Sequence, residues 1–260
     1  MCSTSVPRLR PGLGTFVAVR AEGADTATAQ RAIESAYASF AMVDRLMHPT
    51  RQGSDLVAIR AVALEKGLHV HPWTWQVLAL SQRLNELSNG LFDPCLPSEV
   101  GRMTDIDLPE PGVVVCRATV AIDLGGIAKG FAVDQAVAAL IADGCSAGEV
   151  NAGGDLRVFG PDDQLIWLRT SGTAWPMTLR NQACAVSDPK RSGKPSEHCG
   201  YYHRSNESLV VGSGVAIVVA ETAAVADALT KCVLLSEGAN EQARVQEMLR
   251  VLSARSVVPE

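Results

Sequence analysis

The segment from residue 113 to residue 144, VVVCRATVAIDLGGIAKGFAVDQAVAALIADG, constrains the fold more than any other part of the chain. Its first part is rich in β-branched residues and predicts a strand that ends at Leu124. A glycine turn follows, and the apolar residues after the turn recur at helical spacing. These residues are Phe131, Val137, Leu140 and Ile141. A strand, a turn and a helix in direct succession predict a fold in which helices pack against a sheet.

Strands and helices also follow one another along the rest of the chain. Strands are predicted at residues 14–20, 148–160 (two strands around a glycine turn), 165–170, 174–180, 183–188 and 214–220. Helices are predicted around residues 33–47, from Pro72 to about Ser88, and at 222–236 and 239–254. Residues 188–208 are polar and rich in Pro, Gly and Ser, which predicts a loop. We therefore expect an α+β fold, with a tail at residues 1–12 and a single unit of mixed sheet and flanking helices at residues 13–260.

Composition and charge exclude several classes of protein. The chain has 260 residues, of which 47% are hydrophobic and 20% charged, as in an ordinary globular protein. A net charge of -5 and the lack of a Lys/Arg-rich run argue against nucleic acid and anionic membranes as partners. No apolar run at the N-terminus has the length of a signal peptide or a membrane span, so we expect a cytoplasmic protein. The seven cysteines lack a zinc-binding spacing, and we expect them to be reduced and to fill the core.

The loop DLGGIAKG, residues 123–130, joins the predicted strand to the predicted helix. Free N–H groups at the start of a helix favour an anion, and glycines let the backbone approach that anion closely. Lys129 adds a positive charge. The spacing is neither that of a Rossmann dinucleotide loop nor that of a Walker A loop. From the residues alone, both a phosphate site and a plain tight turn are consistent with this loop.

Two shorter stretches carry similar alternatives. The glycine turn in VNAGGDL, residues 150–156, is either a structural hairpin or one wall of a ligand site. In LFDPC, residues 91–95, Phe92 and Asp93 come just after a helix stop and before a proline, as loop anchors often do. Neither stretch by itself indicates a function.

The stretch VADALTKCVLL, residues 225–235, places an acid and a base four residues apart in an apolar helix. Asp227 and Lys231 share one helix face, and such a pair at a surface is worth about 0.2–0.5 kcal/mol. The apolar neighbours leave little of this helix for solvent, and burying a charged pair costs more than such a bridge returns. The pair therefore needs a context that the rest of the fold must supply.

Seven stretches occur along the chain in this order: GTFVAV, VDRLM, SDL, FDP, IDLGGIAKGFAVD, VNAGGDL and VADAL. In this order they resemble the ApbE-type FAD:protein FMN transferases, from about residue 13 to about residue 240. DLGGIAKGFAVD is the most specific of them. The resemblance implies an α+β core of the T-fold-like kind that is particular to the family. It also implies that FAD is cleaved with the help of Mg2+, and that FMN is attached through a phosphoester to a Ser or Thr hydroxyl of an acceptor protein.

The resemblance further implies which positions form the site. The residues that would line the flavin nucleotide are Leu13, Thr50, Leu91, Phe92, Asp93, Asp123, Gly125, Gly126 and Lys129. The metal would be surrounded by the backbone carbonyl of Gly126, the side chain of Asp227 and the residue Lys231. A carboxylate that faces a cation on a pyrophosphate would explain a buried acid, because Mg2+ takes oxygen ligands.

Three positions depart from the family pattern. Leu13 stands where methionine is frequent, Thr50 where a flavin-stacking tyrosine is common, and Lys231 where threonine is usual. At an effective dielectric of about 20, a unit charge at about 4 Å contributes roughly 4 kcal/mol, so Mg2+ and an ammonium group would repel each other by about twice that. Either the Lys231 ammonium replaces the metal and binds phosphate itself, or the side chain turns away and only its backbone faces the ion.

The histidine motif of the family has no clear counterpart here. The corresponding stretch, AVSDPKRSGKPSEHCGYYH, contains Asp188, His198 and His203, which are the candidates for general acid or base. Two alternatives to a transferase therefore stay open. One is an FAD-binding relative without transfer chemistry, and the other is a scaffold that binds no flavin. The sequence indicates neither the acceptor protein nor the oligomeric state.

Overall fold

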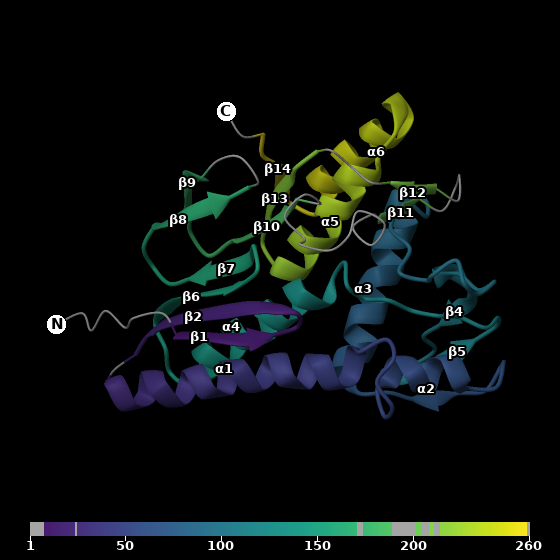
Figure 1. Cartoon of the computed structure of the whole chain (residues 1–260), viewed down its shortest axis with the longest axis horizontal. Helices are drawn as coiled ribbons and strands as arrows, with labels where there is room; N and C mark the ends of the chain where they lie inside the picture. The colour runs from purple at the N-terminus through teal and green to yellow at the C-terminus, as the bar shows by residue number, and fades with distance from the viewer. Residues whose placement is uncertain are drawn as a thin grey trace.

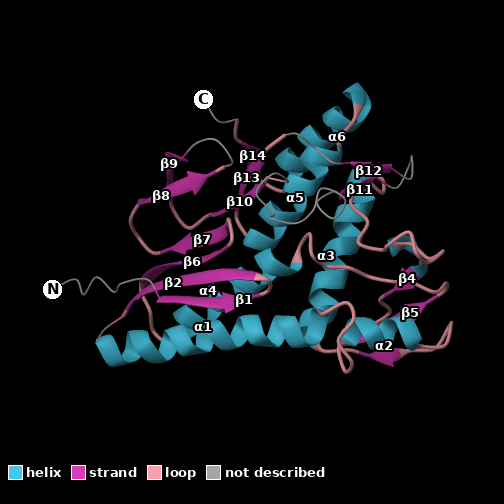
Figure 2. Ribbon diagram, in the orientation of Figure 1, coloured by secondary structure: helices cyan, strands magenta, loops and turns pink. Residues whose placement is uncertain are grey.

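A seven-stranded sheet forms the centre of the computed structural model, which describes residues 8–23, 25–170, 174–188, 201–203, 208–210 and 214–258 (Figures 1 and 2). The strand order is β1-β2-β6-β7-β10-β13-β14. Their bounds are Arg8–Gly12 (β1), Thr15–Glu22 (β2), Ala147–Ala152 (β6), Asp155–Phe159 (β7), Ala183–Ser187 (β10), Ala216–Ala220 (β13) and Arg255–Ser256 (β14). The expected α+β class is confirmed. We expected a mixed sheet, but each of the six strand pairings in this sheet is antiparallel.

Short hairpin turns account for the antiparallel pairing. A two-residue turn at Leu13 and Gly14 joins β1 to β2, and both residues have positive φ, 48° and 71°. Gly153 and Gly154 join β6 to β7, with φ of 66° and 111°. Such turns can connect only antiparallel strands. Residues 8–12 therefore form an edge strand of the sheet, and the expectation that they belong to an N-terminal tail is wrong.

The two faces of the sheet carry separate hydrophobic clusters, because successive side chains of a strand point to opposite faces. In β13, Val218 and Ala220 belong to the larger cluster, whereas Ile217 and Val219 belong to the smaller one. The larger cluster is covered by three helices, α1 (Thr26–Met47), α4 (Ala128–Ala142) and α5 (Ala223–Leu235). The smaller cluster is covered by a hairpin of β8 (Gln164–Arg169) and β9 (Ala174–Leu179).

A second group of elements lies beyond the C-terminal end of α1 (Figure 1). It comprises α2 (Asp55–Ala61), α3 (Pro72–Ser88), the 3-10 helix η1 (Met103–Asp105), and a small sheet of β3 (Leu68–His69), β5 (Val113–Cys116) and β4 (Ile106–Asp107). The last helix, α6 (Gly238–Val251), contacts both α3 and α5. The bounds of α3 are those that Pro72 and the Asn89-Gly90 stop predict.

The strand that we expected to end at Leu124 is much shorter. β5 ends at Cys116, and residues 117–123 pair their backbone with the loop at 94–101 instead of with a neighbouring strand. Leu96 donates to the Ala121 carbonyl at 2.7 Å, and Gly101 donates to the Thr119 carbonyl at 2.9 Å. Only an isolated bridge between Cys95 and Ile122 has β geometry. The loop therefore satisfies the backbone groups that a strand would have offered to a sheet.

The region predicted as a loop at 188–208 also differs from expectation. Tyr201–His203 (β11) pairs with Ser208–Val210 (β12), so two short strands lie in this region. Residues 189–200 and 204–207 are outside the described residues. Two short antiparallel strands can form without a long apolar run, which is why the polar composition did not predict them.

The cysteines behave as expected wherever the structure describes them. Five of them, Cys95, Cys116, Cys145, Cys184 and Cys232, are buried and free. Burial raises the pKa of Cys184 and of Cys232 to about 12. Among the described helices, none combines the length and the apolar character that crossing a bilayer requires.

Asp134 fixes α5 against α4 and the sheet. Its carboxylate accepts hydrogen bonds from the Ala223 and Ala224 N–H groups at the start of α5, both at 2.9 Å, and from Arg157 of β7 at 2.8 Å. Gly130 permits the close contact between the same helices, because a Cβ there would lie 2.2 Å from the Ala223 carbonyl oxygen. These contacts decide where the side chains of α5 lie relative to the glycine loop.

We expect Asp134→Asn to lower the free energy of unfolding by about 1–3 kcal/mol, because the amide brings N–H groups against buried donors and loses the charge opposite Arg157. Urea unfolding followed by circular dichroism measures this change. The control is Asp143→Asn at the exposed C-terminal end of α4, which should leave stability close to that of the wild type. Equal stability of the two variants would contradict the role of Asp134.

Candidate functional site

Four charged side chains from three elements meet beneath the glycine loop. Lys129 comes from the first turn of α4, Asp155 from the start of β7, and Asp227 and Lys231 from α5. We call these four residues the charge cluster. Asp227 and Asp155 are 0% and 2% exposed, and Lys231 is 6% exposed. Because charged groups are almost never buried without partners, the contacts inside the cluster decide whether it is stable.

Each carboxylate of the cluster faces at least one ammonium group. Lys129 Nζ contacts Asp155 Oδ2 and lies 3.7 Å from Asp227 Oδ2. Lys231 Nζ contacts Asp227 Oδ1. The Gly130 backbone N–H also donates to Asp227 Oδ2 at 3.1 Å, so both oxygens of this carboxylate have positive partners. The cluster therefore contains two acids and two bases that neutralise one another.

Two hydroxyl groups hold the ammonium group of Lys231 in place. Lys231 Nζ donates to Ser187 Oγ and to Thr230 Oγ1, each at 3.1 Å. These two hydroxyls lie 2.7 Å from each other, and Thr230 donates to the Asp227 carbonyl at 2.6 Å. With Asp227, these contacts give the ammonium group three oxygen partners, one for each of its N–H donors.

The two carboxylates have opposite pKa shifts. Burial raises the pKa of Asp155, and the nearby Asp227 carboxylate raises it further, while Lys129 and Lys231 offset only part of this effect. Burial also acts to raise the pKa of Asp227, but the ammonium groups of Lys129 and Lys231 outweigh it and hold this pKa below its usual range. Asp227 is therefore the carboxylate that the lysines keep ionised.

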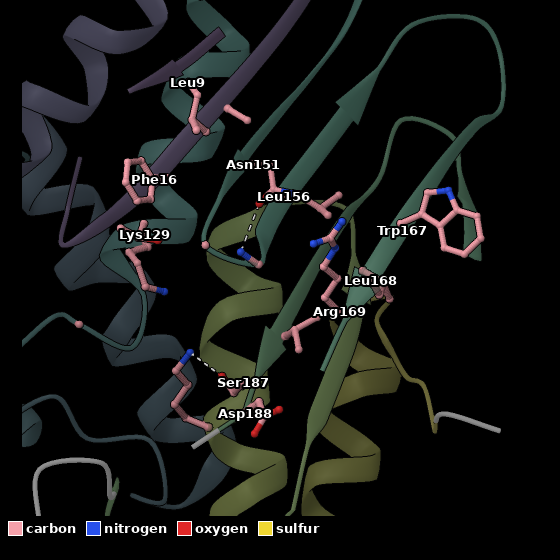
Figure 3. Close-up of a pocket in the computed structure, with 17 residues that line it drawn as sticks. Leu9, Phe16, Lys129, Asn151, Leu156, Trp167, Leu168, Arg169, Ser187 and Asp188 are labelled. Atoms are coloured by element: carbon pink, nitrogen blue, oxygen red, sulfur yellow. Dashed lines mark hydrogen bonds between the residues drawn. The ribbon is translucent and has the colours of Figure 1, made fainter. Parts of the chain in front are cut away.

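A cavity of about 540 Å³ opens above the charge cluster (Figure 3). In the view of Figure 3, Phe16 and Lys129 lie on one side, Arg169 and Trp167 on the other, and Ser187 and Asp188 at one end. Lys231 also lines the cavity, whereas Asp155 and Asp227 do not. The lysines are therefore turned toward the cavity, and the carboxylates lie behind them.

A second cavity of about 400 Å³ shares the lining residues Gly125 and Lys129 with the first. Leu13 and Asp123, two of the predicted nucleotide-site residues, line this second cavity. The Asp123 carboxylate accepts a hydrogen bond from the Gly125 N–H at 2.7 Å, which stabilises the glycine turn. The loop is thus an ordered turn, and it also forms the boundary between two hollows of ligand size.

The structure does not bring all the predicted residues together. Leu91 and Asp93 line a separate hollow of about 390 Å³ beside α3 and α6. Phe92 is buried, and its ring lies 3.8 Å from where a Cβ on Gly126 would be. Thr50 is exposed in the turn after α1, where its N–H donates to His48 Nδ1 at 3.3 Å.

The candidate acids and bases are described to different extents. Asp188 is half-buried and lines the large cavity directly after β10. His203 lies in β11, and its side chain is outside what the structure describes. His198 lies outside the described residues. Among the three candidates, Asp188 is the one that the structure places at the cavity.

The sequence motifs did not indicate Asp155, Arg169 and Ser187 as site residues. Asp155 was part of VNAGGDL, which we read as a hairpin or a ligand-site wall. The available signal was the acid at the first position of a strand in which Leu156 and Val158 are the buried apolar residues of one face. No local signal indicates Arg169, because its role depends on the β8–β9 hairpin lying over the sheet.

The charge cluster does not fit a divalent cation. Both oxygens of Asp227 already face cationic or N–H partners, and Lys231 Nζ contacts one of them. An ion at about 4 Å from that ammonium group would meet a repulsion of about 8 kcal/mol at an effective dielectric of about 20. Within the described residues, no group of three or more His, Cys, Asp or Glu side chains could hold a metal ion. Of our two expectations for Lys231, the geometry disfavours the one in which its side chain turns away.

Comparison with known proteins points to one family. A sequence model of the ApbE family matches residues 13–104 and 98–253. A protein of Rhodobacter capsulatus named FAD:protein FMN transferase is 29% identical over 181 residues, which cover 59% of this chain. The match spans about a third of that relative, 35% of its length.

Solved structures show the same fold at low sequence identity. The apo form of the Pseudomonas stutzeri flavinyl transferase ApbE has a TM-score of 0.80 at 16% identity, covering 100% of this chain and 92% of that one. The ApbE protein of Thermotoga maritima has a TM-score of 0.79 at 21% identity, covering 95% of this chain and 92% of that one. The architecture described above is therefore that of these proteins.

We expect Asp227→Asn to lower the free energy of unfolding by about 3–5 kcal/mol, because Lys231 loses the carboxylate that it contacts while buried. The double variant Asp227→Leu/Lys231→Met removes both charges and should recover much of this loss. Urea unfolding of the wild type and the two variants measures the loss and its recovery.

A matched control is the exposed pair of Glu247 and Arg250 on α6. Glu247→Gln should leave the urea midpoint close to that of the wild type, because surface pairs contribute little. If Asp227→Asn were as mild as Glu247→Gln, the charge cluster would not be a stabilising element.

Proposed function

Because this chain belongs to the ApbE family, we propose that it binds FAD in the two cavities that share Gly125 and Lys129 and transfers the FMN portion to a hydroxyl group of an acceptor protein. The observation that carries the proposal is the position of Lys129 at the junction of the two cavities. FAD is long, with ring systems at both ends and a pyrophosphate between them. Two hollows that meet at a cationic side chain suit a ligand of this shape and charge.

The described side chains suggest how the ends of FAD would be held. Leu13, Val43 and Met47 give the smaller cavity an apolar wall suited to a ring system. In the larger cavity, Lys129, Arg169 and Lys231 line the wall, where their positive charge would attract phosphate oxygens. Leu91 and Asp93 line a separate hollow, so their predicted part in the nucleotide site remains a proposal.

The proposed reaction is a phosphoryl transfer from FAD to the acceptor hydroxyl group. The acceptor hydroxyl oxygen bonds to the phosphorus of the FMN half, and the bond from this phosphorus to the oxygen of the AMP half breaks. AMP leaves with the bridging oxygen, and the proton of the hydroxyl passes to a base. Most of the rate in such reactions comes from positioning and from neutralising the phosphate charge. We assign the base to Asp188, because it is half-buried at the end of the same cavity.

A specific observation favours a second candidate, an FAD-binding protein without transfer chemistry. The donor set around Asp227 does not fit a divalent cation, and the resemblance to the family implies that one takes part. Under this alternative FAD binds and AMP is not released.

The five buried free cysteines are consistent with either candidate function in a reducing cytoplasm, which we propose as the location of the protein.

Titration of FAD against the purified protein tests the binding step. We expect a saturable change in flavin fluorescence and a rise in melting temperature with added FAD. Incubation with FAD and a mixture of acceptor proteins then tests transfer, through release of AMP and through flavin fluorescence that survives on a denaturing gel. Binding with neither signal would support the second candidate, and no binding would reject both.

We expect Asp188→Asn to slow AMP release by about 100-fold or more while the Kd for FAD changes by less than about threefold. The loss of rate follows because the amide cannot accept the hydroxyl proton. Asp163→Asn, at an exposed acid before β8, is the matched control and should leave both quantities unchanged. An unchanged rate in Asp188→Asn with a slow His198→Gln or His203→Gln would assign the base to that histidine instead.

A further inference from the structure

We infer that the ammonium group of Lys231 takes the place of the divalent cation in this chain, so that FAD binds to it without Mg2+. The inference rests on the proposed function, which assigns FAD as the ligand. It concerns how this particular chain neutralises the pyrophosphate, and it follows from the disagreement between the charge cluster and a metal ion.

The first observation is that both oxygens of the Asp227 carboxylate already have partners. Asp227 is fully buried, and Lys231 comes from the same helix one turn later, so the two side chains share one face of α5. Lys231 Nζ contacts Oδ1, and the Gly130 N–H donates to Oδ2 at 3.1 Å. A cation that used this carboxylate would first have to displace the ammonium group from Oδ1.

The second observation is that the lysines of the charge cluster line the cavity. Lys129 and Lys231 line the cavity, whereas their counter-ions Asp155 and Asp227 lie behind them. Ser187 and Thr230 hold the Lys231 ammonium group at this wall, each at 3.1 Å. A pair that served only to stabilise α5 would not need its positive end at the cavity surface.

The third observation concerns the charged side chains that line the cavity. Its charged residues are Lys129, Arg169, Lys231 and Asp188, and the buried carboxylates of Asp155 and Asp227 contact the two lysines from behind. A pyrophosphate diester carries one negative charge on each phosphate, and Lys129, Arg169 and Lys231 are the cationic side chains of this wall that can face it. Lysine binds phosphate as a compact point charge, which suits this role.

The test compares FAD affinity in EDTA and in millimolar MgCl2, measured by flavin fluorescence. For the wild type we expect the two Kd values to agree within about twofold. Lys231→Thr removes the ammonium group and leaves Asp227 with a neighbouring hydroxyl, which are oxygen ligands that Mg2+ accepts. This variant should lose at least about tenfold in affinity in EDTA and regain most of it with MgCl2.

Two further variants separate charge from shape. Lys231→Met keeps a long side chain without the charge, and it should lose at least about tenfold in affinity in both conditions. Lys66→Met, at an exposed lysine away from the cavities, is the matched control and should bind FAD as the wild type does. Circular dichroism checks that each variant is folded, and the wild-type comparison needs no variant at all.

Three results would overturn the inference. They are tenfold or greater tightening of wild-type FAD binding by MgCl2, FAD binding by Lys231→Met at wild-type affinity, and a lack of metal response in folded Lys231→Thr. If the wild type bound FAD in neither condition, the proposed function would fail, and with it the contact between Lys231 and pyrophosphate. Melting curves with MgCl2 alone would then still decide the claim about the metal, since MgCl2 should raise the melting temperature of Lys231→Thr and not that of the wild type.

Discussion

The contact between Asp227 and Lys231 sets the conditions for the rest of the site. Asp227 has no exposure to solvent, so its charge depends on partners supplied by two helices. These partners are Lys231 on its own helix, Lys129 on α4, and the backbone N–H of Gly130. Such a carboxylate is stable only if α4 and α5 lie close together. The absence of a side chain at Gly130 and the capping of α5 by Asp134 allow this arrangement.

The same arrangement determines what the cavity offers to a ligand. With both acids of the charge cluster behind the lysines, the cavity wall presents N–H donors and positive charge. Under the proposed function, the pyrophosphate of FAD needs positive charge beside it, which an ammonium group or a metal ion can supply. The two differ in cost, because an ammonium group built into the chain needs no binding equilibrium but carries only one charge. Arg169 and Lys129 add the remaining positive charge here.

Prediction from the sequence succeeded where the signal was local. Pro72 and the Asn89-Gly90 stop predicted the ends of α3, and the glycines of VNAGGDL predicted the turn between β6 and β7. It failed where partners distant in sequence decided the outcome. Residues 117–123 looked like a strand, but the loop at 94–101 takes up their backbone groups. Residues 8–12 looked like a tail because a positive φ at Leu13, which lets them fold back on β2, has no sequence signal at a leucine.

The sequence by itself determined that the chain is α+β, that its motifs follow the order of the ApbE family, and that an acid and a base share one face of an apolar helix. The physical reason is that helical periodicity, glycine turns and i, i+4 spacing act over a few residues. Only the tertiary structure decided that Asp155 and Lys129 complete the cluster and that the lysines face the cavity. Charge pairing and burial are properties of residues that meet in space, and no local pattern in the sequence indicates that Asp155 and Asp227, which are far apart in the chain, lie in one cluster.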